Sequence, residues 1–196
     1  MIDYHSDPNF WQCFLSCAGF YQDTIDGDFG VNSMKAAHDF EQASIALGNT
    51  LGSFDGRSEG NIQMLMPTAQ RKARDFMNAV AAAGITVKII SATRTYAEQD
   101  ELFSRGRTKP GLKVTNARGG QSNHNFGVAW DIGIFTDGQY HPESPLYKEV
   151  GDIGRALSLE WGGDWHKFQD EPHFQAVPEA KLGEIAAKFE NGTAFV

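Results

Sequence analysis

The chain has few of the features that mark membrane, secreted disulfide-rich or nucleic-acid-binding proteins. Only two of its 196 residues are cysteine, Cys13 and Cys17, and the spacing of four on an expected helix favours two small core side chains in a reducing compartment. No apolar stretch approaches the ~20 residues that span a bilayer. The first residues, MIDYHSDPNFWQCF, lack a basic region followed by an apolar run, so we expect no secretory signal.

Positive charge is also scarce. The formal net charge is -8, which argues against general binding to nucleic acid or to anionic membranes, although it is compatible with a local basic patch. With 41% hydrophobic and 21% charged residues, the composition is ordinary for a globular protein. The length suits one medium domain, or one medium domain with a small module, and we expect a monomer.

The first 48 residues predict a small all-α module. Asp7 and Pro8 are a typical N-cap and first-turn proline for a helix over residues 8–17. A second helix is expected over residues 33–47, with Met34, Ala37 and Phe40 facing inward. The next stretch, residues 49–66, is rich in Gly, Ser and Asn and has no periodicity, so we interpret it as a linker.

The remaining residues, 67–196, mix helices with a few strands that need not be parallel, which indicates an α+β domain. Thr95 and Glu98 form the T-x-x-E pattern of a capping box. Helices are expected at residues 67–83, 96–105, 144–157 and 178–190, and strands at residues 85–92, 128–135 and 173–176.

An acidic residue interrupts the apolar strand V-A-W-D-I-G-I-F. Successive side chains of a strand point to opposite faces, so Val128, Trp130, Ile132 and Ile134 share one bulky apolar face. Asp131 lies on the other face, between Ala129 and Gly133. A buried carboxylate is costly without a partner, so a partner is expected beside it.

Two histidines can supply that partner. His124 precedes the strand, and the turn Asn125-Phe126-Gly127 lets the chain reverse between His124 and Asp131. His173 follows Pro172 and begins a short strand in which Phe174 points away from it. Two imidazoles and one carboxylate are a plausible zinc set with a fourth position open for water, as in catalytic sites.

A hydrolytic zinc site also needs a general base and a cation for the developing oxyanion. Asp170 and Glu171 stand close to His173, and Arg94 ends a strand. Each residue also has a non-catalytic interpretation. Asp170 and Glu171 could belong to an acidic turn before Pro172, and Arg94 could be a solvated charge at the end of a strand.

The motifs in combination resemble a known family. In order along the chain they are S-A-T-R-T-Y-A-E-Q, G-R-T-K-P-G-L-K-V-T-N-A, G-G-Q-S-N-H-N-F-G-V-A-W-D-I, W-G-G-D-W and D-E-P-H-F. The family is that of the zinc L-alanyl-D-glutamate peptidases of phage endolysins and bacterial autolysins, relatives of D-alanyl-D-alanine carboxypeptidases with a hedgehog-like fold. The resemblance covers roughly residues 62–176 and implies a small antiparallel sheet with flanking helices.

The resemblance implies a role for each matching residue. The zinc ligands would be His124, Asp131 and His173. Asp170, three positions before the last ligand, matches the catalytic acid, with Glu171 as the alternative, and Arg94 matches the arginine that polarises the scissile carbonyl. The positions that match the substrate groove are Ser122, Gln99 and, in the W-G-G-x-W segment, Trp165.

The N-terminal segment has its own, weaker resemblance. F-W-Q-C-F-L-S-C-A-G-F-Y-Q-D-T-I-D-G-D-F-G resembles a three-helix peptidoglycan-binding module in which Asp26, Gly27 and Gly30 shape a loop and Phe29 packs beneath it. We therefore expect a module at residues 1–48, a linker at 49–66 and a zinc peptidase at 67–196.

The function implied is an endolysin that waits in the host cytoplasm and then cuts the stem peptide of bacterial peptidoglycan. Two alternatives stay open. One is a D-alanyl-D-alanine carboxypeptidase, and the other is a wall-binding protein whose zinc site is only structural.

Overall fold

A small antiparallel sheet lies at the centre of the computed structural model, which describes residues 2–176 and 181–195. The strand order is β1-β2-β5-β4, and β3 pairs with the far end of β2. The strands are β1 (Val87–Ser91), β2 (Ala129–Thr136), β3 (Gln139–Tyr140), β4 (Glu160–Trp161) and β5 (His173–Gln175). The mixed α+β class expected from the sequence is confirmed.

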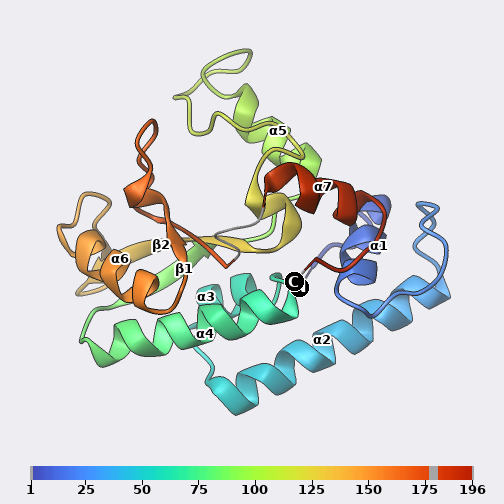
Figure 1. The fold of residues 1–196 in the computed structure, drawn as a ribbon, viewed down its shortest axis with the longest axis horizontal. Coiled ribbons are helices and arrows are strands. Elements are labelled where there is room, and N and C mark those ends of the chain that lie inside the picture. The colour runs from blue at the N-terminus through green and yellow to red at the C-terminus, as the bar shows by residue number, and fades with distance from the viewer. Residues whose placement is uncertain (1, 177–180, 196) are drawn as a thin grey trace.

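Helices surround this sheet (Figure 1). They are α1 (Pro8–Cys17), α2 (Val31–Leu51), α3 (Gly56–Ile62), α4 (Pro67–Ala82), α5 (Tyr96–Ser104), α6 (Leu146–Ala156) and α7 (Leu182–Glu190), with 3-10 turns η1 (Asn123–Phe126) and η2 (Gly162–Asp164). In the two described ranges, no helix is both long enough and apolar enough to cross a bilayer. The expected start of the last helix at Pro178 lies outside the described residues.

Local sequence signals explain several helix starts. The Asp7 carboxylate accepts a hydrogen bond from the Phe10 amide at 3.2 Å, with Pro8 in the first turn of α1. At α5, the Thr95 hydroxyl and the Glu98 carboxylate make the reciprocal capping box that the sequence predicts. One expectation for α2 is wrong, because Met34 is half exposed instead of facing inward.

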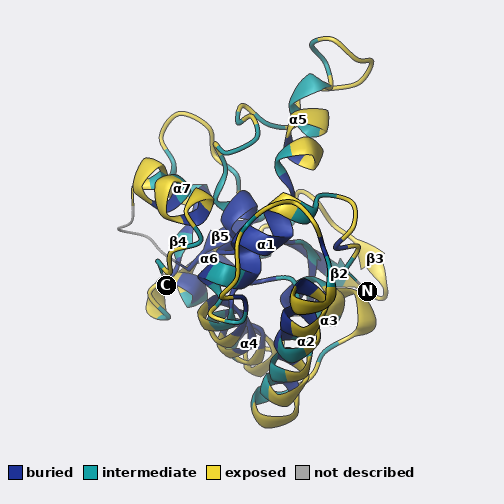
Figure 2. Ribbon diagram, turned by 90° about the vertical axis from the view of Figure 1, so that its right-hand side faces the viewer, coloured by how far each residue is buried: buried dark blue, intermediate teal, exposed yellow. Residues whose placement is uncertain are grey.

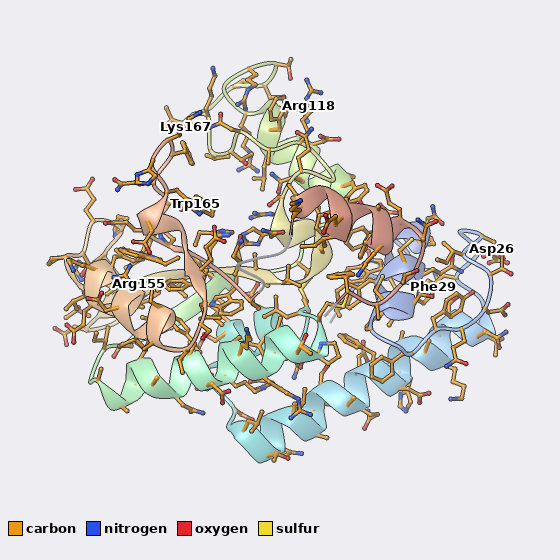
Figure 3. All side chains as sticks on the ribbon, viewed as in Figure 1. Asp26, Phe29, Arg118, Arg155, Trp165 and Lys167 are labelled. Carbon is orange, nitrogen blue, oxygen red and sulfur yellow. The ribbon has the colours of Figure 1, made fainter. Side chains whose placement is uncertain are left out.

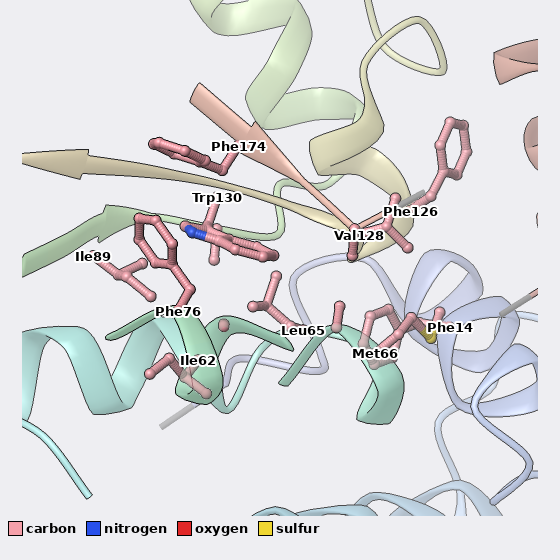
Figure 4. Packing of buried hydrophobic residues seen from close by; sticks show 14 of the residues in the cluster. Phe14, Ile62, Leu65, Met66, Phe76, Ile89, Phe126, Val128, Trp130 and Phe174 are labelled. Atoms are coloured by element: carbon pink, nitrogen blue, oxygen red, sulfur yellow. The ribbon is translucent and has the colours of Figure 1, made fainter. Parts of the chain in front are cut away.

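The apolar face of the sheet packs on α4. Phe76 of α4 lies with its ring centroid 4.6 Å from that of Phe174 and 6.1 Å from that of Trp130, and all three side chains are fully buried (Figure 4). The predicted alternation of β2 is therefore confirmed, with Trp130 and its apolar neighbours directed toward this helix. The opposite face of the sheet, where Asp131 and His173 point, is left for the candidate site.

Residues 49–66 are not the irregular linker expected from composition. They hold the last turn of α2 and the whole of α3, which packs against β1. A buried ion pair joins this segment to α4, since the Arg74 guanidinium, which has no exposed surface, binds the Glu59 carboxylate through two contacts of 2.6 and 2.9 Å. Arg74 also donates to the Gly52 carbonyl at 2.7 Å, which caps the end of α2. Composition alone missed α3 because glycine and serine are poor helix formers.

The N-terminal segment packs directly on the rest of the chain. Figure 2 shows α1 as largely buried, and its Phe10 ring lies 5.2 Å from Phe189 of α7. Both cysteines are free and buried in this region, as expected. The loop after α1, with Asp26 and Phe29 marked in Figure 3, is anchored by Gln12, whose side-chain oxygen accepts from the Asp26 and Gly27 amides. That residues 1–48 act as a separate binding module stays a prediction.

Candidate metal centre

The sheet and one turn bring three distant residues together. Asp131 of β2 and His173 of β5 are direct partners in the antiparallel register. His124 lies in η1, and Gly127 ends this turn with a φ of +66° before the chain enters β2. This left-handed conformation favours glycine, so the turn anticipated between His124 and Asp131 is confirmed.

The three potential ligand atoms form an almost equilateral triangle. His124 Nε2, His173 Nδ1 and Asp131 Oδ1 are each 3.2 Å from the other two. Tetrahedral ligand atoms at zinc–nitrogen distances of about 2.0–2.1 Å would lie about 3.3–3.4 Å apart. In the part of the chain that the structure describes, these three residues make up a group of His, Cys, Asp or Glu side chains whose ligand atoms lie close enough together to hold a metal ion. The donor set and its spacing therefore fit zinc and leave a fourth position open.

Hydrogen bonds on the far side of each imidazole select the nitrogen that faces the centre. His124 Nδ1 lies 2.6 Å from the Ala92 carbonyl oxygen, so Nδ1 carries the proton and Nε2 is free to bind a metal. His173 Nε2 lies 3.2 Å from Gln175 Oε1, which leaves its Nδ1 free. Such contacts fix both the ring orientation and the tautomer before a metal arrives.

Gln175 belongs to a longer chain of hydrogen bonds. Its Oε1 also accepts from the Asn123 side chain at 2.7 Å, and its Nε2 donates to Glu160 at 2.9 Å. Glu160 in turn accepts from Trp165 Nε1 at 2.6 Å, and the Trp165 ring lies 4.8 Å from the His173 ring. The orientation of His173 is thus coupled to a tryptophan that lines the cleft, and neither Gln175 nor Glu160 was predicted from sequence.

The charges at the centre favour an ionised carboxylate. Burial opposes ionisation of Asp131, but the two neighbouring histidines outweigh it and hold the pKa of Asp131 well below its usual range. Burial lowers the pKa of His124, with Arg94 adding to the effect, so this imidazole is neutral at pH 7, as a metal ligand requires. For His173, the hydrogen bond and charge of Asp131 outweigh burial and raise the pKa.

Arg94 lies beside the acidic ligand. Its Nη1 is 3.5 Å from Asp131 Oδ2 and 2.9 Å from the Ser91 hydroxyl, and its Nε donates to Gln99 at 3.0 Å. The Arg94 side chain is 20% exposed and lines the cleft, whereas Gln99 is fully buried and does not. Gln99 donates instead to the Ala117 carbonyl at 2.9 Å. The contacts of Gln99 hold Arg94 and the loop that contains Ala117, and a direct substrate contact for Gln99 stays a prediction.

The two candidates for the general base, Asp170 and Glu171, have different environments in the structure. Asp170 lines the cleft beside His173, and burial together with the charge of Asp131 raises the pKa of its carboxyl group. The Glu171 side chain is exposed and lies outside the cleft lining, and the Glu171 carbonyl accepts from the Trp161 indole at 2.7 Å. The Asp170 amide donates to the Gly162 carbonyl at 3.0 Å, and this close approach requires glycine at position 162, because a side chain there would collide with the Asp170 carbonyl oxygen. The geometry thus favours Asp170.

A cleft of about 520 Å³ opens over the three ligands. Ser122 and Trp165 both line it, and their contact with substrate stays a prediction. One wall is the loop that follows α5, and the other is the loop that carries Trp165, which Figure 3 labels. Apolar side chains from these two loops, α5 and α7 also line the cleft: Val114, Phe168, Leu102 and Leu182.

The chain is similar to known peptidases. Residues 115–176, which contain the three ligands and Asp170, match a family model described as D-alanyl-D-alanine carboxypeptidase. The chain is 40% identical over 125 residues to peptidoglycan L-alanyl-D-glutamate endopeptidase CwlK of Bacillus subtilis, covering 58% of this chain and 74% of that one. It is 29% identical over 124 residues to the L-alanyl-D-glutamate peptidase of Listeria phage A118, covering 61% of this chain and 40% of that one. A solved structure, the L-Ala D-Glu endopeptidase ChiX of Serratia marcescens, aligns with a TM-score of 0.48 and 26% identity over 62% of this chain and 87% of that one.

Proposed function

The chain belongs to the L-alanyl-D-glutamate peptidase family, and from this premise we propose that it is a zinc peptidase that hydrolyses the bond between L-alanine and D-glutamate in peptidoglycan. The observation that supports the proposal most directly is the triangle of His124, Asp131 and His173, which has the spacing of a tetrahedral zinc site and opens into a cleft.

Zinc would be held by His124 Nε2, His173 Nδ1 and one Asp131 oxygen. Bound there, the ion would supply Lewis acidity to a water molecule and to the peptide carbonyl. Asp131 is already ionised in the folded protein and His124 is already neutral, so little proton release is needed before these two groups bind.

Asp170 would act as the general base and then as the general acid. Its carboxyl group faces the cleft beside His173, and its raised pKa moves it closer to neutral pH, where proton exchange is most efficient. In the proposed reaction, Asp170 takes a proton from the attacking water and passes it to the nitrogen of D-glutamate as the peptide bond breaks.

Arg94 would stabilise the negative charge that develops on the carbonyl oxygen. The guanidinium is held by Ser91 and Gln99, so it needs little reorganisation when that charge appears. Asp131 offsets part of its charge at 3.5 Å. An arginine and an acid in the cleft also count against a purely structural zinc site, which needs neither.

The test is mass spectrometry of fragments released from purified peptidoglycan. We expect new L-alanine carboxyl termini and new D-glutamate amino termini, and none after treatment with a chelator. Asp170→Asn should retain the zinc content and melting temperature of the wild type while hydrolysis falls by at least about a hundredfold. Release of free D-alanine would instead identify a carboxypeptidase, and full activity of Asp170→Asn would refute the role of that residue.

We also propose that residues 1–48 bind peptidoglycan, and that the whole protein acts as a phage endolysin, released from the host cytoplasm to the wall. The resemblance of residues 10–42 to a wall-binding module and the similarity to a phage peptidase support this view. Even weak binding by the module would raise the substrate concentration near the cleft. Size-exclusion chromatography with light scattering tests the expected monomer.

A further inference from the structure

The loop between α5 and the metal centre has a charge opposite to that of the chain. Its residues 105–118 contain five of the 17 lysines and arginines and no aspartate or glutamate, although the net charge of the protein is -8. The five are Arg105, Arg107, Lys109, Lys113 and Arg118. We call residues 105–118 the basic loop.

The basic loop has a defined structure. Gly106, with a φ of +67°, donates from its amide to the Lys109 carbonyl at 2.9 Å. The Arg107 guanidinium donates to the Phe103 carbonyl at 2.7 Å and to the Thr115 carbonyl at 3.0 Å, which joins the two ends of the loop. These contacts hold the charged side chains in one region, so less conformational entropy is lost when a ligand binds them.

Most of this charge lacks an acidic partner within the protein. Lys109 pairs with Glu101, but among the described residues no carboxylate forms an ion pair with the other four. Instead, Arg107 and Arg118 both lie over the Phe103 ring, with guanidinium carbons 3.9 and 4.5 Å from its centroid. Two cations held against one ring repel each other, and an anion between or beside them would relieve this repulsion.

The basic loop is also a wall of the cleft. Its residues 114–117 line the space above Asp131 and His173. The opposite wall contributes Trp165 and Phe168, and the exposed Lys167 stands between them in sequence. Figure 3 shows Arg118 and Lys167 on the two loops that flank the cleft. A substrate that enters the cleft therefore passes a rim with positive charge on both sides.

We propose that the basic loop and Lys167 bind the free carboxylates of the peptidoglycan stem peptide on the D-glutamate side of the cleaved bond. This inference rests on the proposed function. D-glutamate gives its amino group to the scissile bond, so both of its carboxyl groups lie beyond it, and one stays free when the other continues the peptide. Guanidinium groups pair with carboxylates through two parallel hydrogen bonds, which suits Arg118 in particular.

The experiment compares two triple variants that lose the same charge. One is Lys113→Gln with Arg118→Gln and Lys167→Gln. The matched control, with exposed residues on α4, α6 and α7, is Arg71→Gln with Lys148→Gln and Lys188→Gln. Binding to purified peptidoglycan stripped of phosphate polymers is measured by cosedimentation on ice at low salt, after circular dichroism has shown that both variants are folded.

We expect the first variant to bind roughly tenfold more weakly than the wild type and the control to stay within about twofold, since each exposed pair contributes modestly. Amidation of the peptidoglycan carboxyls should weaken the wild type by a similar factor and leave the first variant unchanged. Charge-conserving substitutions that keep Arg118, Lys113→Arg with Lys167→Arg, should retain the affinity of the wild type within about twofold.

Equal binding by the first variant and the wild type would overturn the proposal. So would an equal loss in the control, or a loss seen only on walls that retain phosphate polymers. Because cosedimentation does not depend on cleavage, these results are separate from the fragment analysis. Carboxylate-dependent binding together with release of D-alanine would refute the proposed bond and leave the basic loop as a carboxylate-binding surface.

Discussion

Removal of the Glu59 charge tests whether residues 49–66 are part of the folded core. In Glu59→Gln, the Arg74 guanidinium stays fully buried and loses its ionic partner. Breaking a buried pair costs about 3–5 kcal/mol, and we expect the lower end because Glu59 is 18% exposed. For a chain of this size, about 3 kcal/mol corresponds to a fall in melting temperature of roughly 6–12 °C, measured by circular dichroism.

The pH dependence sharpens this prediction. Burial opposes ionisation of Glu59, but the hydrogen bond and charge of Arg74 outweigh it and lower its pKa. Its contribution to stability is therefore complete above the unfolded pKa of about 4.3 and is lost as the pH falls through the lower folded pKa. The difference in melting temperature between wild type and Glu59→Gln should shrink in that acidic window.

Two control variants make the result interpretable. Asp39→Asn removes the exposed pair with Lys35 and should change stability by less than about 1 kcal/mol. The double variant Glu59→Leu with Arg74→Met should recover most of the loss. If Glu59→Gln melts within about 2 °C of the wild type at pH 7, the reasoning is wrong and the segment is a linker in energetic terms.

Three further predictions follow from the geometry. Gln175→Leu should weaken zinc binding about 10- to 100-fold, measured by competition with a chelator, because His173 loses the contact that orients its ring; unchanged affinity would refute this role. On acidification, zinc affinity should begin to fall at a higher pH than it would at a site whose histidines have an ordinary pKa, because the pKa of His173 is raised and a protonated imidazole cannot bind zinc. Zinc titrations between pH 5 and 8 measure this onset, and an onset at the ordinary histidine pKa would contradict the prediction. Gly154→Ala should destabilise by about 1–3 kcal/mol in urea unfolding, since the new methyl would lie 2.5 Å from the Phe174 ring, whereas Gly60→Ala in open space should stabilise slightly.

The three metal ligands could be predicted from the sequence because local sequence patterns mark their positions. The alternation around Asp131 and the glycine after the His124 turn each follow from the conformations that a strand or turn allows. His173 was a candidate from its place after Pro172 at the start of a short strand, and the β2–β5 register confirms it as a direct neighbour of Asp131. What strand periodicity could not provide was the choice between Asp170 and Glu171, because Pro172 interrupts a regular strand there.

Long-range contacts account for what the sequence did not reveal. Gln175 and Glu160 lie on neighbouring strands whose pairing has no local signature, so their link to His173 emerged only from the structure. Helix α3 was missed for a related reason, because its stability comes from packing on β1 and from the buried pair with Arg74. Gln99 matched a groove position by motif, and its hydrogen bonds to Arg94 and to the Ala117 carbonyl emerged only from the structure.

The contact between Phe14 and Gly127 restricts how this enzyme can be rebuilt by recombination. The Phe14 ring of α1 lies so close to the turn that ends at Gly127 that an added methyl there would be 2.6 Å from it. A chimera in which another binding module replaces the first 48 residues would lose the Phe14 ring that packs against the turn containing His124. Successful exchanges should therefore retain α1, or bring a bulky apolar side chain of their own to the same place.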